Sequence, residues 1–414
     1  MLFLAMRAGD FVNAAAGMWF VPKYVSAEEI GAVLPVSSFA TFISLPAFAL
    51  AMAVMKESAV LAAAGERGKV KSLLGGVFAV ALAILVLTLS VSALAMPRYL
   101  HLMRVDDPTA GFLVVAAAFL GCIAPVWTDA LQALKRFRAL AAAEFGGSLI
   151  RFATMAAAMP FKALSGYFAG QAALPVFRIA ASAIALRSDM KVESVPFWNG
   201  NSFRRLAGAF AAILVYQGMP MFVSMLELSI LRDALPAEDS AGYYMVSRFS
   251  DFLHYLTFPV LLVMFPYTAT AAAKGESTRP YVTKCSLATL GTATVMATAY
   301  LFAGRELLPL MPNGEKYLGY AIYMPVLTIA NALTSCQVFY TNSEVSAGRF
   351  GFFGWFLPLH LAYAAALYFA CRAGCISSPN DIIAWFAAAA TARFAIPALL
   401  TFFPRTAPAG VRSP

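Results

Sequence analysis

Apolar residues occur along this chain in blocks of about twenty, separated by short polar stretches. An α-helix of that length crosses the roughly 30 Å hydrocarbon core of a bilayer. Lipid cannot satisfy the hydrogen bonds of an open strand edge, so the spanning segments are predicted to be helices. The blocks predict about twelve transmembrane helices, near residues 2–22, 29–54, 72–96, 109–133, 139–159, 164–186, 206–230, 241–267, 283–303, 317–341, 350–371 and 381–402.

The two halves of this pattern repeat each other. EEIGAVLPVSSF, a span and AAAGERGKVKSLL correspond to EDSAGYYMVSRF, a span and AAAKGESTRPYVTKCSL, and Gly31 and Gly65 pair with Gly242 and Gly275 about 210 residues later. Repeats with an even number of spans enter the membrane from the same side, so an axis along the bilayer normal relates them. The repeat predicts two six-helix lobes, residues 1–195 and 206–414, joined by a cytoplasmic linker at 196–205 and facing a central cleft.

The composition supports an integral membrane protein, with 61% hydrophobic and 12% charged residues against about 25% charged in soluble domains. By the positive-inside rule, the lysine- and arginine-rich even-numbered connections are cytoplasmic, as are both termini. The net charge of +9 is therefore a topology signal and not a sign of nucleic-acid binding. Arg7 and Asp10 interrupt the first apolar block, which favours a membrane helix over a cleaved signal peptide.

Cysteines and phosphate-binding motifs add no further chemistry. The five cysteines are scattered without metal-ligand spacing, so neither a metal nor another cofactor is predicted. No loop of the GxxxxGK[ST] kind is present to cradle a nucleotide. Cys371 and Cys375 could form a disulfide if their loop faces an oxidising compartment, and otherwise stay reduced.

Several spans contain ionisable residues. A charge at bilayer depth costs about 2.5 to 3.5 kcal/mol, so each should face protein or water and have a partner or a task. These residues are Arg7, Asp10, Asp129, Glu144, Arg151, Arg178, Glu227, Arg248, Asp251, His254, His360 and Arg393.

Their spacing places several of them on shared helix faces. Arg248 and Asp251 lie three residues apart with His254 at the edge of that face, and Glu144 and Arg151 lie seven apart. Polar stripes on two further spans comprise Gln217, Ser224 and Glu227, and Asn331, Thr334 and Ser335. If these faces turn inward, they line a hydrated cavity that Arg248, Arg151 and Arg178 make basic. An anion is the natural ligand, because a guanidinium stays charged and binds phosphate in a bidentate manner.

Structural roles are the alternative for each of these residues. Arg248 could simply neutralise Asp251, and Glu144 could lock a helix pair with Arg151. Arg7 could reach the cytoplasmic surface. Arg178 and Arg393 could contact lipid headgroups near the ends of their spans, and His360 could be a packing residue.

Four stretches resemble a known family. YVSAEEIGAVLPVSSF, LQALKRFRALAAAEFGGSLIRF, AGYYMVSRFSDFLHYLTFPVLLVMFP and LMPNGEKYLGYAIYMPVLTIANAL are similar to segments of polysaccharide and lipid II flippases of the multidrug/oligosaccharidyl-lipid/polysaccharide exporter superfamily. The resemblance implies a V-shaped cavity with alternating access that carries a polyprenyl-pyrophosphate-linked sugar. It also implies a cavity arginine at Arg248 and a counterpart at Arg7.

Together these observations predict a flippase for a lipid-linked oligosaccharide in the bacterial inner membrane, with membrane lipids and other polysaccharide assembly proteins as further partners. It is not expected to be an enzyme. The predicted cavity residues are Arg248, Arg151, Arg7, Arg178, Asp251, His254, Glu144, Glu227 and Asn331.

Three other functions stay open. A cation-coupled multidrug exporter of the same superfamily would use Asp10, Glu227 and Asp129 to bind Na⁺ or H⁺. A membrane glycan polymerase or glycosyltransferase would need a larger outer loop than this chain has. A non-transporting scaffold would tolerate neutralisation of all these charges.

Overall fold

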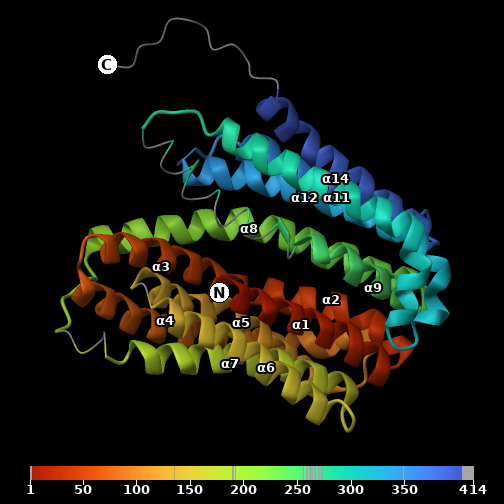
Figure 1. The fold of residues 1–414 in the computed structure, drawn as a ribbon, viewed down its shortest axis with the longest axis horizontal. Helices are drawn as coiled ribbons and strands as arrows, with labels where there is room; N and C mark the ends of the chain where they lie inside the picture. The colour runs from red at the N-terminus through yellow and green to blue at the C-terminus, as the bar shows by residue number, and fades with distance from the viewer. Residues whose placement is uncertain are drawn as a thin grey trace, which may run out of the picture. The chain divides into compact units, whose positions relative to one another are not determined.

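The computed structural model describes residues 2–402 except 135, 189, 190, 192, 255, 258, 259, 261–263, 265, 266, 269, 270, 272, 273 and 348. These residues form an all-α protein with no strand among them (Figure 1). The helices are α1 Leu2–Tyr24, α2 Ala27–Ile43, α3 Leu45–Ala63, α4 Arg67–Leu102, α5 Pro108–Ala133, α6 Phe137–Ala158, α7 Ala163–Leu186, α8 Gly200–Ala234, α9 Ala237–Ser250, α11 Arg279–Leu307, the 3-10 helices η2 Leu308–Leu310 and η3 Gly314–Ile322, α12 Tyr323–Ser346, α13 Phe353–Arg372 and α14 Pro379–Phe402.

The predicted spans coincide with these helices. Among the described residues, eight helices are long and apolar enough to cross a membrane, or nine if α2 and α3 form one bent span. For the predicted span 241–267, the structure describes the helix as far as Ser250 and only scattered residues beyond it. The chain is a multi-pass membrane protein.

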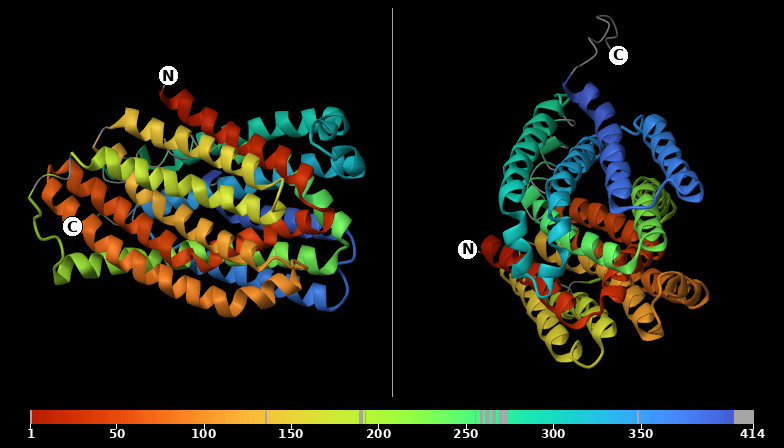
Figure 2. Two further views of the ribbon diagram at one scale, coloured as in Figure 1. Left: turned by 90° about the horizontal axis from the view of Figure 1, so that it is seen from below. Right: turned by 90° about the vertical axis from the view of Figure 1, so that its right-hand side faces the viewer.

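Contacts between helices divide the chain into two compact units. The first contains Met1–Ala241 with Met311–Asn313, and the second contains Gly242–Leu310 with Gly314–Pro414. In the first unit, α5, α6 and α7 pack along one another and α8 packs against α2 and α3 (Figures 1 and 2). These units are defined by packing, whereas the two lobes were inferred from the sequence repeat, which stays a prediction.

The repeat recurs in the backbone of the turns. Gly65 and Gly275, 210 residues apart, have φ angles of +77° and +71°, and Arg104 and Asn313, 209 residues apart, have φ angles of +58° and +60°. After both glycines, the next amide bonds a carbonyl five residues back, Glu66 to Leu61 at 2.9 Å and Glu276 to Ala271 at 2.8 Å. This is the hydrogen bond that closes a helix end with a left-handed residue. Corresponding turns in the two halves therefore share one conformation.

The second span of each half is interrupted. In the first half, α2 ends at Ile43 and α3 starts at Leu45 at an angle of 59°. In the second half, α9 ends at Ser250 after 14 residues. A broken transmembrane helix frees backbone groups that neighbouring helices must satisfy. Here Tyr300 on α11 donates its hydroxyl to the carbonyl of Phe249, 2.9 Å away.

Helix α8 starts earlier than the sequence predicted. The side chain of Asn199 accepts from the Ser202 amide at 2.8 Å, and the Ser202 hydroxyl accepts from the Asn199 amide at 2.9 Å. This reciprocal capping box fixes the helix start at Gly200. Residues 200–205, predicted to lie in the linker, are therefore helical.

Candidate functional site

The C-terminal polar cluster, formed by Tyr244, Arg248, Ser250, Asp251 and Asn331, lies where α9 is interrupted. Arg248 Nη2 is 2.8 Å from Asp251 Oδ2, and the guanidinium lies 5.0 Å from the centre of the Tyr244 ring. Asn331 on α12 donates from Nδ2 to Ser250 Oγ at 3.2 Å. Arg248 is thus held by the carboxylate of Asp251 and the ring of Tyr244. Asn331 connects α12 to Ser250, the last residue of α9.

The ion pair of this cluster stays accessible. The side chains of Arg248 and Asp251 are 25% and 31% exposed. A fully enclosed ion pair would serve structure alone, whereas a partly exposed guanidinium can exchange one anionic partner for another. His254, which follows the break, is exposed and its backbone amide bonds the Asp251 carbonyl at 2.9 Å.

The N-terminal polar cluster, formed by Asn13, Asp129, Glu144, Ser148 and Arg178, joins four helices of the first unit. Arg178 Nη2 on α7 is 2.5 Å from Glu144 Oε2 on α6, and Asp129 on α5 lies near enough for its charge to repel that of Glu144. Asn13 on α1 donates to Ser148 Oγ at 3.0 Å. The cluster places a second carboxylate, that of Asp129, near the Glu144–Arg178 ion pair.

Small residues allow these helices to approach closely. A Cβ on Gly9 of α1 would lie 2.8 Å from Ser148 Oγ, and a Cβ on Gly147 would lie 3.1 Å from Arg178 Cγ. Such close approach is typical of helix packing in membranes. Arg151, one turn beyond Ser148 on α6, is half-buried. Glu144 on α6 is therefore paired with Arg178 on α7. Spacing within one helix could not reveal this partner, because the two residues lie on different helices.

The remaining predicted residues are Glu227, Arg7, Asp10, His360 and the two cysteines Cys371 and Cys375. Glu227 is half-buried on α8, in the first unit. The side chains of Arg7 and Asp10 lie outside the described residues. His360 is buried, with Nδ1 2.8 Å from the Phe356 carbonyl oxygen, as a packing histidine would be. Cys371 and Cys375 are both free thiols.

Arg393 and Arg178, for which headgroup contact was the alternative, both have partners within the protein. Arg393 is buried, bonds the Ala389 carbonyl at 3.2 Å and lies 5.2 Å from the centre of the Tyr363 ring. Arg178 is paired with Glu144. Position along a span suggested the interface, but neighbouring helices supply aromatic and acidic partners that a single helix does not display.

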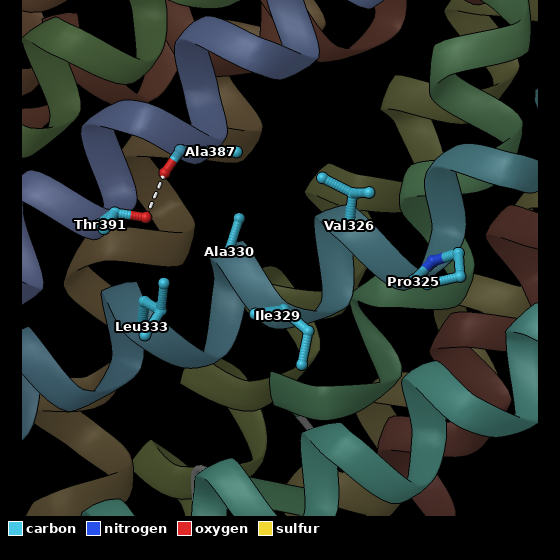
Figure 3. A pocket seen from close by; sticks show the side chains of 7 residues that line it. All are labelled: Pro325, Val326, Ile329, Ala330, Leu333, Ala387 and Thr391. Carbon is cyan, nitrogen blue, oxygen red and sulfur yellow. Dashed lines mark hydrogen bonds between the residues drawn. The ribbon is translucent and has the colours of Figure 1, made fainter.

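Sequence reasoning missed an apolar pocket of about 310 Å³ within the second unit (Figure 3). It is lined from α12 and α14 by Pro325, Val326, Ile329, Ala330, Leu333, Ala387 and Thr391. The Thr391 hydroxyl donates to the Ala387 carbonyl at 2.8 Å and so adds no free polar group. The i, i+3, i+4, i+7 spacing of Val326, Ile329, Ala330 and Leu333 could have indicated this apolar face. Asn331 lies on a different face of α12.

No protein-family model and no curated protein matches the chain. Among the described residues, no group of three or more histidines, cysteines or carboxylates could hold a metal ion.

Solved structures match the chain over nearly its whole length. An inward-facing multidrug resistance MATE family transporter of the MOP superfamily has a TM-score of 0.70 at 13% identity, with 95% of this chain and 94% of that chain covered. The Vibrio cholerae MATE transporter VcmN has a TM-score of 0.63 at 16% identity, with coverages of 97% and 94%. The lipid II flippase MurJ has a TM-score of 0.64 at 10% identity, with coverages of 96% and 86%. The chain therefore has the fold of the MOP-superfamily transporters, as the sequence resemblance predicted.

Proposed function

We propose that this protein is a flippase that moves a polyprenyl-pyrophosphate-linked oligosaccharide from the cytoplasmic to the outer leaflet of the bacterial inner membrane. The observation that carries the proposal is the partly exposed Arg248 at the interruption of α9. Alternating access presents it to each side in turn. Both chain termini are cytoplasmic in this proposal, in line with the distribution of lysine and arginine.

Arg248 is equipped to bind a pyrophosphate. Asp251 and Tyr244 hold the guanidinium in place before a ligand arrives, so less side-chain freedom is lost on binding. A pyrophosphate can replace the single carboxylate with a bidentate, doubly charged partner. The Asn331 amide and the neighbouring hydroxyls offer neutral hydrogen bonds to the first sugar.

The apolar pocket between α12 and α14 supports a lipid-linked substrate. Its lining offers hydrocarbon contacts and no unsatisfied polar atom, and Asn331 lies on another face of the same helix. A ligand with a charged head and a hydrocarbon tail can bind Arg248 with its head and the apolar pocket with its tail. A soluble anion makes no favourable contact with the apolar pocket.

The membrane potential can drive this transport without a nucleotide. A potential negative inside favours outward movement of an anion by about 2.3 kcal/mol per charge per 100 mV. The same potential favours return of the empty, positively charged site toward the cytoplasm. Other proteins of cell-surface polysaccharide assembly would then take up the product at the outer leaflet.

The test is reconstitution in liposomes with a fluorescent polyprenyl-pyrophosphate oligosaccharide, scored for movement between leaflets. Arg248→Ala should lose nearly all transport, and Arg248→Lys should keep a small part, because lysine keeps the charge without the planar fork. Arg305→Ala, on an exposed arginine of α11, is the matched control. Transport by Arg248→Ala at the wild-type rate would refute the proposal. Lengthening of the glycan in the same assay would indicate a polymerase or transferase.

A cation-coupled exporter is the second candidate, and the closeness of Asp129 and Glu144 favours it. Two neighbouring carboxylates inside the membrane can bind a proton or Na⁺ in a transporter. In that case Asp129→Asn would abolish efflux driven by an ion gradient and leave Arg248 dispensable. The same liposomes, loaded with a cationic dye, separate the two functions.

A further inference from the structure

The segment between the two sequence repeats is docked along a groove on α4. We call this segment, residues 193–199, the strap. The groove is formed by Gly68, Ser72 and Gly76, which lie four residues apart and therefore on one face of the helix. The strap has no regular secondary structure and leads directly into α8.

Polar contacts fix the register of the strap on this groove. The amide of Val195 bonds the Gly68 carbonyl at 3.2 Å, and the amide of Phe197 bonds Ser72 Oγ at 3.3 Å. Trp198 donates from its indole to the Ser72 carbonyl, also at 3.3 Å. Gly68 and Ser72, one turn apart on α4, thus both bond the strap.

The two glycines are needed for this contact. A Cβ on Gly68 would lie 2.7 Å from both the Glu193 carbonyl oxygen and Val195 Cγ2, and a Cβ on Gly76 would overlap the Trp198 indole. Gly75, beside Gly76, faces open space. Phe197 is 4% exposed and packs into the apolar core of the first unit, which includes Leu73 and Val77 of α4. The strap is therefore part of the packed first unit.

The far end of α8 is fastened to α4 as well. The hydroxyls of Tyr99 on α4 and Ser229 on α8 are 2.5 Å apart. Arg232, fully buried in the last turn of α8, donates from Nε to the carbonyl of Met103, which directly follows α4, at 3.1 Å. Between these ends α8 packs on α2 and α3. Both ends of α8 are thus tied to the same helix.

We propose that α8 moves with the N-terminal helices as one body during transport, and that the strap is the device that fastens it. The sequence repeat assigns α8 to the second half, but among the described residues α8 packs on α2 and α3 and groups with the first unit. The joint between the moving bodies then falls after α8 and not at the linker between the repeats. This inference concerns movement and holds for a flippase or an exporter alike.

The first test is the reactivity of single cysteines placed in the strap. In a cysteine-free background, Phe197→Cys, at a position that is 4% exposed, should react with a water-soluble maleimide about ten-fold more slowly than Val195→Cys, at a position that is 45% exposed, because a packed thiol is inaccessible and its thiolate is disfavoured. Equal rates at the two positions would show that the strap is not docked, whatever the substrate of the protein.

The second test measures distances by spin labelling in nanodiscs. One pair joins exposed positions on α4 and α8, Val80→Cys and Val215→Cys, and the other joins α4 to α11, Val80→Cys and Phe302→Cys. The α4–α8 distance distribution should be single and narrow, and the α4–α11 distribution should be broader. Equal widths overturn the proposal.

Variants that release the strap from α4 are compared with a variant of the neighbouring residue that does not. Gly76→Leu should broaden the α4–α8 distribution, because its side chain displaces Trp198, whereas Gly75→Leu should leave it unchanged. Trp198→Ala removes the indole without adding volume and serves if Gly76→Leu does not fold. An unchanged α4–α8 distribution in Trp198→Ala, with wild-type stability, would mean that the strap does not hold α8.

Discussion

Arg232 at the end of α8 donates a hydrogen bond to the backbone carbonyl of Met103, although its side chain is completely buried. Its Nη1 and Nη2 atoms have no hydrogen-bond partner among the described residues. The like charge of Arg104 acts on it, opposed by the charge of Glu28. Burying a cation with so few partners lowers the free energy of unfolding. The hydrogen bond to Met103 nevertheless fixes the position of the end of α8.

Arg232→Met should therefore be tolerated far better than Arg232→Ala. Methionine fills the volume and removes the buried charge, while alanine leaves a cavity that costs about 2 to 4 kcal/mol. Thermal unfolding in detergent should give Arg232→Met a midpoint near that of the wild type and Arg232→Ala a clearly lower one. Equal losses in the two variants would mean that the hydrogen bond to Met103 dominates.

The Glu144–Arg178 pair should stabilise the packing of α6 on α7. Arg178→Gln should lower the free energy of unfolding by about 1 to 3 kcal/mol, because it removes the cationic partner of Glu144 and keeps the repulsion from Asp129. Adding Asp129→Asn should restore part of the loss by removing the repulsion between the carboxylates. The comparison needs unfolding curves of the two single variants and the double variant. Additive effects would show that Asp129 and Glu144 do not interact.

Asp251→Asn should strengthen anion binding at Arg248. The substitution removes the carboxylate that occupies the guanidinium and keeps a side chain of nearly the same size. On the proposed function, the affinity for a polyprenyl pyrophosphate should rise several-fold, while turnover falls because release of the anion slows. Native mass spectrometry and the liposome assay measure the two quantities. Weaker binding in this variant would assign Asp251 to the ligand and not to competition with it.

Asp107 should make stability depend on acid pH. It accepts from Ser165 Oγ at 2.5 Å and from the Thr109 amide at 2.9 Å, which ties the start of α5 to α7. Burial alone would raise the pKa of Asp107, but these hydrogen bonds together hold it below the ordinary value of 3.8. A lowered pKa means that the carboxylate stabilises the fold above its ordinary pKa and that this contribution is lost as pH falls through the lowered value.

Asp107→Asn should therefore destabilise the protein near neutral pH, and the difference from wild type should shrink in acid. Unfolding midpoints measured over a pH series give this dependence. Asp106→Asn, at the exposed neighbouring residue, is the control and should not change the midpoint. A constant difference between Asp107→Asn and wild type at all pH values would contradict the role assigned to the charge.

The sequence determined the membrane spans and the repeat because both depend on local information. The length of an apolar block decides whether a helix can cross a bilayer, whatever its neighbours are. Glycine recurs at positions 65 and 275 of the repeat, and both residues have a left-handed φ, which glycine adopts without steric cost. The charged residues within the spans, including Arg248 and Asp251, could also be identified from the sequence, because ionisable residues are rare in apolar blocks.

Only the tertiary structure decided which charges meet and which helices belong together. Arg178 pairs with Glu144 across two helices, and Arg232 at the end of α8 is buried against Met103. The strap and both ends of α8 lie on α4 because small residues and hydrogen-bond partners more than a hundred positions apart meet there. A sequence repeat records common ancestry of two segments, whereas packing follows contact area and polar satisfaction, which depend on residues far apart in the chain.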